Sequence, residues 1–136
     1  MASVLKVDTI TGVTTAGSIA VTGEGNSTTT NLQQGLTKVW ATWDSANNPA
    51  TLEDSFNTSS LTDVEQGVFQ VNINNNMSGA YYSPVGMIRF YHMCVQSTMP
   101  SSSVLSLRAF YVTSTAGARG SYDNAFMTAQ IAGDLA

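Results

Sequence analysis

The chain has few charged residues, which narrows both its fold and its partners. Only 10% of its 136 residues are Asp, Glu, Lys or Arg, and the net charge is -4. There is too little Glu, Lys and Arg to cover amphipathic helices, so an all-α fold is not expected. The five basic residues are scattered along the sequence, whereas phosphate recognition needs a basic patch. We therefore expect no nucleic-acid partner.

Cysteine and histidine occur once each, as Cys94 and His92. An internal disulfide needs two cysteines, and a structural zinc site needs four Cys or His ligands. The chain can build neither by itself. His92 and Cys94 could share one strand face, but a packed histidine and a buried thiol are the simpler interpretation. We expect no catalytic residue, no metal and no cofactor, so the chain is not expected to be an enzyme.

The carboxylates show no catalytic or metal-binding spacing. Glu53 and Asp54 are adjacent and would point to opposite faces of a strand, which disfavours the carboxylate pair of a glycosidase. A calcium site remains a weaker alternative, because the candidate aspartates lack the spacing of a loop site. These candidates are Asp44, Asp54, Asp63 and Asp123.

Long apolar runs are also lacking. No segment approaches the ~20 apolar residues of a membrane-spanning helix. The first residues do not form a basic segment followed by an apolar core, as a secretory signal would. We therefore expect no membrane partner, and folding in a reducing cytosol.

The abundant residues favour strands and turns. Thr, Val, Tyr and Phe suit strands, and Asn, Gly and Ser suit turns. Period-two alternation predicts that three sets of residues each share one face of a strand. These sets are Val39, Ala41 and Trp43; Phe69, Val71 and Ile73; and Met127, Ala129 and Ile131. The predicted body strands span 36–43, 51–57, 61–64, 68–74, 85–96, 104–113 and 126–131. A three-residue loop at 65–67 predicts a hairpin, and 114–124 is expected to be a long loop.

These elements predict an all-β fold, a small antiparallel β-sandwich or jelly-roll-like body with an extended N-terminal arm. Residues 1–34 would form the arm and linker, with short strands at 4–10 and 18–22 and a polar stretch at 26–34. Residues 35–136 would form the body. The segment 85–96 is apolar on both faces, as expected of a strand that is central or lies under a subunit interface.

Three stretches resemble tail-fibre-type and other virion surface proteins of tailed, often marine or cyanobacterial, bacteriophages. These are Leu5-Lys6-Val7-Asp8-Thr9-Ile10 near the start, the block 35–77, and the ending Ile131-Ala132-Gly133-Asp134. Within the block the closest pieces are Gly35-Leu36-Thr37-Lys38-Val39-Trp40, Asp54-Ser55-Phe56-Asn57 and Ser60-Leu61-Thr62-Asp63.

The resemblance implies a non-enzymatic structural protein of a virion, made in the host cytoplasm. It implies a tail-fibre-like homotrimer anchored to other virion proteins by its N-terminal arm. Family members are typically longer, so a capsid decoration or cement protein and a head fibre stay open as alternatives. A glycan-binding module that recognises a host receptor is another.

Candidate site residues follow from these interpretations. Arm residues expected to anchor the protein are Leu5, Val7 and Ile10. Residues expected at a subunit interface are Trp40, Val85, Met87, Tyr91 and Met93. Aromatic residues expected in loops, where they could stack on a host surface glycan, are Tyr81, Tyr82 and Tyr122.

Overall fold

The computed structural model describes residues 4–12, 19–22, 29–89, 93–96, 101–112 and 119–135. The chain divides into two units, Met1–Gly35 and Leu36–Ala136. Among the described residues, no helix is long and apolar enough to cross a membrane.

The first unit holds a small hairpin and one helical turn. Strand β1 (Ala20–Thr22) pairs antiparallel with β2 (Thr29–Asn31), and α1 (Leu32–Gly35) follows directly. The predicted strand at 4–10 is wrong, because residues 4–12 contain no strand. A strand needs a hydrogen-bonded neighbour, and this segment has none among the described residues. The predicted strand at 18–22 is shorter than expected, and the polar stretch at 26–34 contributes β2.

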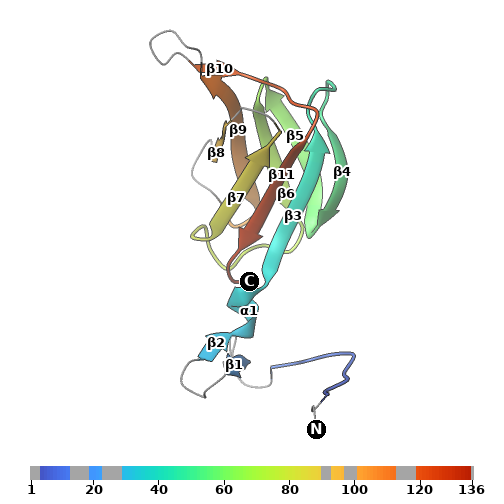
Figure 1. The fold of residues 1–136 in the computed structure, drawn as a ribbon, viewed down its shortest axis with the longest axis vertical. Coiled ribbons are helices and arrows are strands. Elements are labelled where there is room, and N and C mark those ends of the chain that lie inside the picture. The colour runs from blue at the N-terminus through green and yellow to red at the C-terminus, as the bar shows by residue number, and fades with distance from the viewer. Residues whose placement is uncertain are drawn as a thin grey trace. The chain divides into compact units, whose positions relative to one another are not determined.

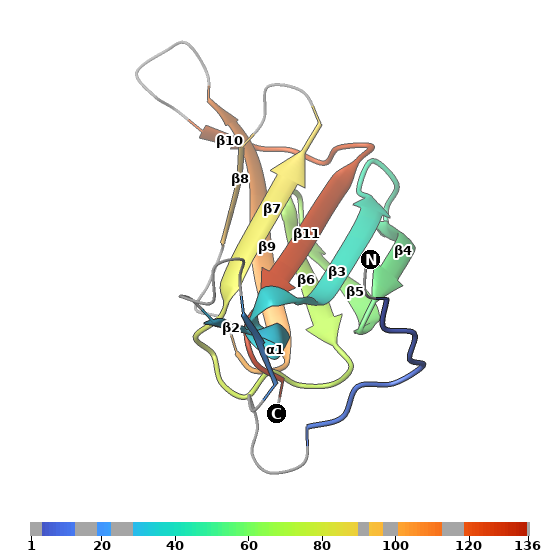
Figure 2. The same cartoon turned by 60° about the horizontal axis from the view of Figure 1, so that its bottom comes forward.

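The second unit consists of two antiparallel sheets packed face to face (Figures 1 and 2), which confirms the predicted all-β sandwich. The first sheet has the order β4-β3-β11-β7. Its strands are β3 (Thr37–Asp44), β4 (Thr51–Phe56), β7 (Ser83–Ile88) and β11 (Met127–Ala132).

The second sheet has the order β10-β9-β6-β5, and β8 also pairs with β9. Its strands are β5 (Thr58–Glu65), β6 (Val68–Ile73), β8 (Met93–Gln96), β9 (Val104–Val112) and β10 (Arg119–Ser121). Part of the predicted loop at 114–124 therefore forms β10, which pairs with the end of β9.

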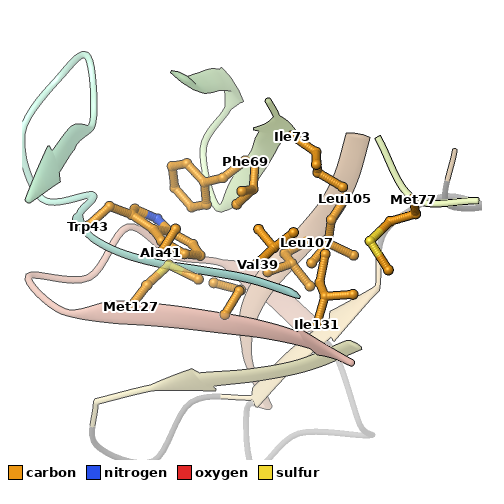
Figure 3. Packing of buried hydrophobic residues seen from close by; sticks show 13 residues of the cluster. Val39, Ala41, Trp43, Phe69, Ile73, Met77, Leu105, Leu107, Met127 and Ile131 are labelled. Carbon is orange, nitrogen blue, oxygen red and sulfur yellow. The ribbon is translucent and has the colours of Figure 1, made fainter. Parts of the chain in front are cut away.

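The core lies between the two sheets (Figure 3), and the three predicted sets of aligned residues all point into it. Every second residue of β3, β6 and β11 is buried there, and β9 contributes Leu105, Leu107 and Ala109. The rings of Trp43 and Phe69 meet across the sandwich with centroids 6.1 Å apart. Period-two patterning thus placed the core side chains correctly, because each strand buries one face.

A single residue, Asn57, carries the chain from β4 in one sheet to β5 in the other. Its backbone is left-handed, with φ of 55°. Its amide nitrogen donates to the carbonyls of Lys38 and Asn75, both at 3.1 Å, and its amide oxygen accepts from the N–H of Asn75 at 2.7 Å. Asn57 therefore ties this corner to strand β3 and to the turn after β6.

The hairpin between β5 and β6 turns through Gln66 and Gly67, a loop one residue shorter than predicted, because Glu65 still pairs with Val68. Gly67 has φ of 72°. A Cβ at Gly67 would lie 2.6 Å from the carbonyl oxygen of Ala109, so the position accepts glycine alone. The predicted hairpin is confirmed.

The predicted single strand at 85–96 is wrong. Residues of this segment form two strands, β7 and β8, which belong to different sheets. The two strands approach closely, since a Cβ at Gly86 would lie 2.7 Å from the sulfur of Cys94. The apolar pattern on both faces misled the prediction, because the segment passes from one sheet to the other. Strand β7 is also an edge strand and not a central one.

Candidate interaction surface

The outer face of the β4-β3-β11-β7 sheet carries a row of large side chains. In the strand register, Val85 lies opposite Gln130, Gln130 opposite Trp40, and Trp40 opposite Phe56. The row therefore crosses all four strands. Val85 is 59% exposed and Phe56 is 54% exposed, while Trp40 is half-buried. We call Trp40, Phe56, Val85, Met87 and the polar residues between them the apolar outer face.

The neighbouring row is neutral apart from one corner. Met87, which is 65% exposed, lies opposite Thr128, followed by Thr42 and then Asp54 on β4. The Thr128 hydroxyl donates to the carbonyl of Ala41 at 3.1 Å, so its polar group is already satisfied within the sheet. A partner covering this face would therefore meet apolar surface and satisfied hydroxyls.

The outer face of the other sheet is polar. The amide nitrogen of Asn72 donates to the hydroxyls of Ser60 and Thr62 at 3.0 and 2.9 Å. Arg108 and Glu65 form an ion pair at 2.8 Å on the same sheet. Such a face is well solvated as it stands, whereas the apolar outer face would gain free energy on being covered.

The structure brings together part of the predicted interface set. Trp40, Val85 and Met87 share the apolar outer face. Met93 begins β8 in the other sheet, and Tyr91 lies outside the described residues. Phe56 was missed as a site residue, although its strand was predicted. The signal that identifies it is the pairing with Trp40, which depends on the register shift between β3 and β4.

The three candidate receptor tyrosines have different environments. Tyr81 is 96% exposed. Tyr82 is partly buried, and its hydroxyl donates to the carbonyl of Val104 at 3.0 Å. Burial raises the pKa of Tyr82 to about 12. Tyr122 packs edge-on against Tyr111 at 6.2 Å. Tyr81 is thus the one of the three whose ring is almost fully accessible.

The predicted arm residues are all exposed. Leu5, Val7 and Ile10 lie in the segment 4–12. Val21 on β1 is exposed as well. The first unit thus presents apolar side chains that its own short hairpin does not bury.

A shallow depression of about 400 Å³ lies beside the end of β5. Two carboxylates in its lining are hydrogen-bonded to the backbone of the body. Asp63 accepts from the N–H of Ala50 at 3.0 Å, and Asp123 accepts from the N–H of Gly67 at 2.6 Å. Its lining comprises Asn48, Pro49, Asp63, Val64, Glu65, Gln66 and Asp123.

Of the two residues considered for nucleophilic chemistry, His92 and Cys94, the structure describes only Cys94. His92 lies outside the described residues. Cys94 is a free thiol, and burial raises its pKa to about 11, so it is protonated and weakly nucleophilic at neutral pH. Within the described ranges no group of three or more His, Cys, Asp or Glu side chains is placed to hold a metal ion.

Comparison of the chain with protein-family models, with curated proteins and with solved structures finds no match in any of the three. The resemblance to phage virion proteins therefore stays a prediction.

Proposed function

We propose that this protein is a non-enzymatic structural component of a tailed-phage virion, and that its copies assemble through the apolar outer face. A tail-fibre-like homotrimer with the N-terminal segment as its anchor is the form that the resemblance implies. The observation that carries the assembly proposal is the exposed row of Val85, Trp40 and Phe56 across one sheet.

Covering apolar surface contributes roughly 25 cal/mol per Å². The apolar outer face offers large side chains with little charge to desolvate, while the opposite outer face is polar and internally hydrogen-bonded. Subunit contact on the first face is therefore favoured over contact on the second.

The first experiment is light scattering on the purified full-length protein, which gives the mass in solution. We expect a mass of several chains, three if the resemblance holds. At low protein concentration Phe56→Asp should lower the mass to that of one chain, because a carboxylate would be desolvated at the interface. Thr62→Asp, on the polar outer face, is the matched control and should leave the mass unchanged. Equal masses for the two variants would contradict assembly through Phe56.

The virion role is tested separately. Antibody labelling of phage particles in electron micrographs should place the protein on the virion, at the tail for a fibre and at the head for a decoration protein or head fibre. Deletion of residues 2–25 should abolish incorporation while the body stays folded by circular dichroism. A truncated protein that still incorporated normally would refute the anchoring role of Leu5, Val7 and Ile10.

The exposure of Tyr81 favours one second candidate, a glycan-binding receptor module. An exposed tyrosine ring can stack on the apolar face of a sugar. Binding of labelled protein to host cells should then fall in Tyr81→Ala. Tyr82→Phe is the control, because the Tyr82 hydroxyl is used inside the body. Unchanged binding in Tyr81→Ala would count against this candidate.

A further inference from the structure

Strand β7 lies at the end of its sheet, and no strand of the described residues pairs with its far edge. It pairs with β11 from Ser83↔Ala132 to Ile88↔Met127 without a register shift, and β11 is its one hydrogen-bonded strand within the described ranges. An edge strand presents unpaired backbone N–H and C=O groups, which readily accept another strand.

The other edges carry the usual protection against such pairing. Strand β4 has Glu53 and Asp54 side by side, and its ladder with β3 contains a register shift. Strand β5 has Asp63 and Glu65 and two register shifts. Strands β8 and β10 have only four and three residues. Short length, charge and bulges all discourage edge pairing, whereas β7 has no charged residue and only Pro84 as a partial block.

The hydrogen-bond pattern shows which groups of β7 are available. Just beyond the strand, the N–H of Arg89 donates to the carbonyl of Phe126 at 3.2 Å. Bonding direction alternates along an antiparallel ladder, so Val85 and Met87 also bond toward β11. The backbone groups of the alternate residues Pro84, Gly86 and Ile88 therefore point to the open edge.

We propose that this edge pairs antiparallel with β7 of a second copy, centred on Gly86. Gly86 and the partner's Gly86 would exchange both backbone hydrogen bonds. The Ile88 N–H of each copy would donate to the Pro84 carbonyl of the other. Since proline has no N–H, the Ile88 carbonyl gains no bond in return. This register pairs every residue from Pro84 to Ile88, which a shifted register does not.

The side chains that meet in this register support a second copy as the occupant. In this register Val85 faces the partner's Met87, and Met87 faces the partner's Val85. Both positions belong to a pair without hydrogen bonds, where side chains approach most closely. The chain has a net charge of -4, which disfavours contact between copies in general. Because β7 has no charged residue, pairing at its edge adds no close contact between like charges.

The contact is small. Five paired residues extend over about 17 Å, and one strand pair buries much less than the ~800 Å² per partner of a stable interface. The pairing is therefore weak and concentration-dependent, suited to linking neighbouring subunits that are already crowded together. It is two-fold and does not rest on the proposed virion role, which the mass and labelling experiments above test by themselves.

Disulfide trapping tests the register directly. Full-length Val85→Cys and Met87→Cys proteins, both with Cys94→Ala to remove the native thiol, are mixed and mildly oxidised. Directly opposed residues are close enough for a disulfide, while diagonal residues are not. We expect the mixed dimer to predominate over either self-linked dimer. The proposal would be overturned if no mixed dimer formed, or if the self-linked Val85→Cys dimer were as abundant as the mixed dimer.

A charge pair tests the same contact without oxidation or changes at Cys94. Val85→Glu with Met87→Glu places carboxylates opposite each other, whereas Val85→Lys with Met87→Glu places opposite charges there. Both sites are more than half exposed, so both variants should fold. In the variant with two glutamates, we expect the mass to stop rising with protein concentration. In the variant with lysine and glutamate, we expect the mass still to rise with concentration, and this rise to weaken in high salt. The same concentration dependence in both, or its loss in both, would refute pairing of Val85 with the partner's Met87.

Discussion

Replacement of Asn57 should destabilise the body more than replacement of an ordinary surface residue does. The residue combines a left-handed backbone, with φ of 55°, and three side-chain hydrogen bonds. Asparagine tolerates this conformation better than alanine does. Because Asn57 is the whole connection between β4 and β5, no neighbouring loop residue can take over its role.

The expected magnitude follows from these parts. Placing alanine in the left-handed region costs about 1 kcal/mol. Each lost hydrogen bond contributes roughly 0.5–1 kcal/mol, at the low end of the usual range because the site is partly solvated. Asn57→Ala should therefore lower the free energy of unfolding by about 3 kcal/mol. Asn57→Gly loses the hydrogen bonds but accepts the backbone conformation, so its loss should be about 2 kcal/mol.

Urea unfolding of the full-length variants measures this difference. The midpoint should fall in the order native, glycine variant, alanine variant, with similar slopes if the denatured states are alike. Two results would refute the reasoning. If both variants unfolded within about 0.5 kcal/mol of the native protein, the hydrogen bonds would contribute nothing. If the glycine variant were the less stable of the two, backbone strain would not be the reason for asparagine at this corner.

Three further predictions follow from buried groups. Gly67→Ala should destabilise by more than about 3 kcal/mol, since its Cβ would lie 2.6 Å from the Ala109 carbonyl oxygen; a melting temperature equal to that of the native protein would contradict this. Ser45→Ala should destabilise by about 1–3 kcal/mol in urea, because the buried Ser45 hydroxyl donates to the Asn124 carbonyl at 2.8 Å and accepts from its N–H at 2.7 Å; an unchanged midpoint would disprove it. Burial raises the pKa of Cys94 from 9.0 to about 11. Because the unfolded thiol ionises first, the resulting stability is complete below pH 9 and is lost as the pH rises toward 11. Cys94→Ala should therefore flatten the dependence of unfolding free energy on pH between 9 and 11, and an unaltered slope would argue against a buried thiol.

The strands of the body could be predicted because burial on one face imposes a period of two. The inward residues of β3, β6 and β11 follow that period without a break, and the hairpin turn at Gly67 has a clear glycine signal. These features depend on neighbours in sequence. A two-layer sandwich is one of the few architectures that bury the apolar faces of several such strands.

Features that depend on distant residues were not predictable in the same way. The pattern over 85–96 predicts one strand, because period-two alternation does not show which sheet receives each half of the segment. The break lies where Arg89 meets Phe126 and Asn124, since the Asn124 amide nitrogen donates to the Arg89 carbonyl at 3.1 Å. That contact joins residues 35 positions apart. Likewise, Phe56 could not be assigned to the surface row without the register between β3 and β4.

The two outer faces carry the remaining functional information. Neither face is required for the core, which lies between the sheets. Alternation requires outward residues on every strand but does not specify their polarity. In one sheet the outward row is hydrogen-bonded and polar, as at Asn72, and in the other it is apolar, as at Trp40, Phe56 and Val85. Folding alone gives no reason for this difference, whereas contact with another subunit does, because covering the apolar face removes it from water. The uncharged β7 edge borders that same face, so the two proposed contacts lie on one side of the sandwich.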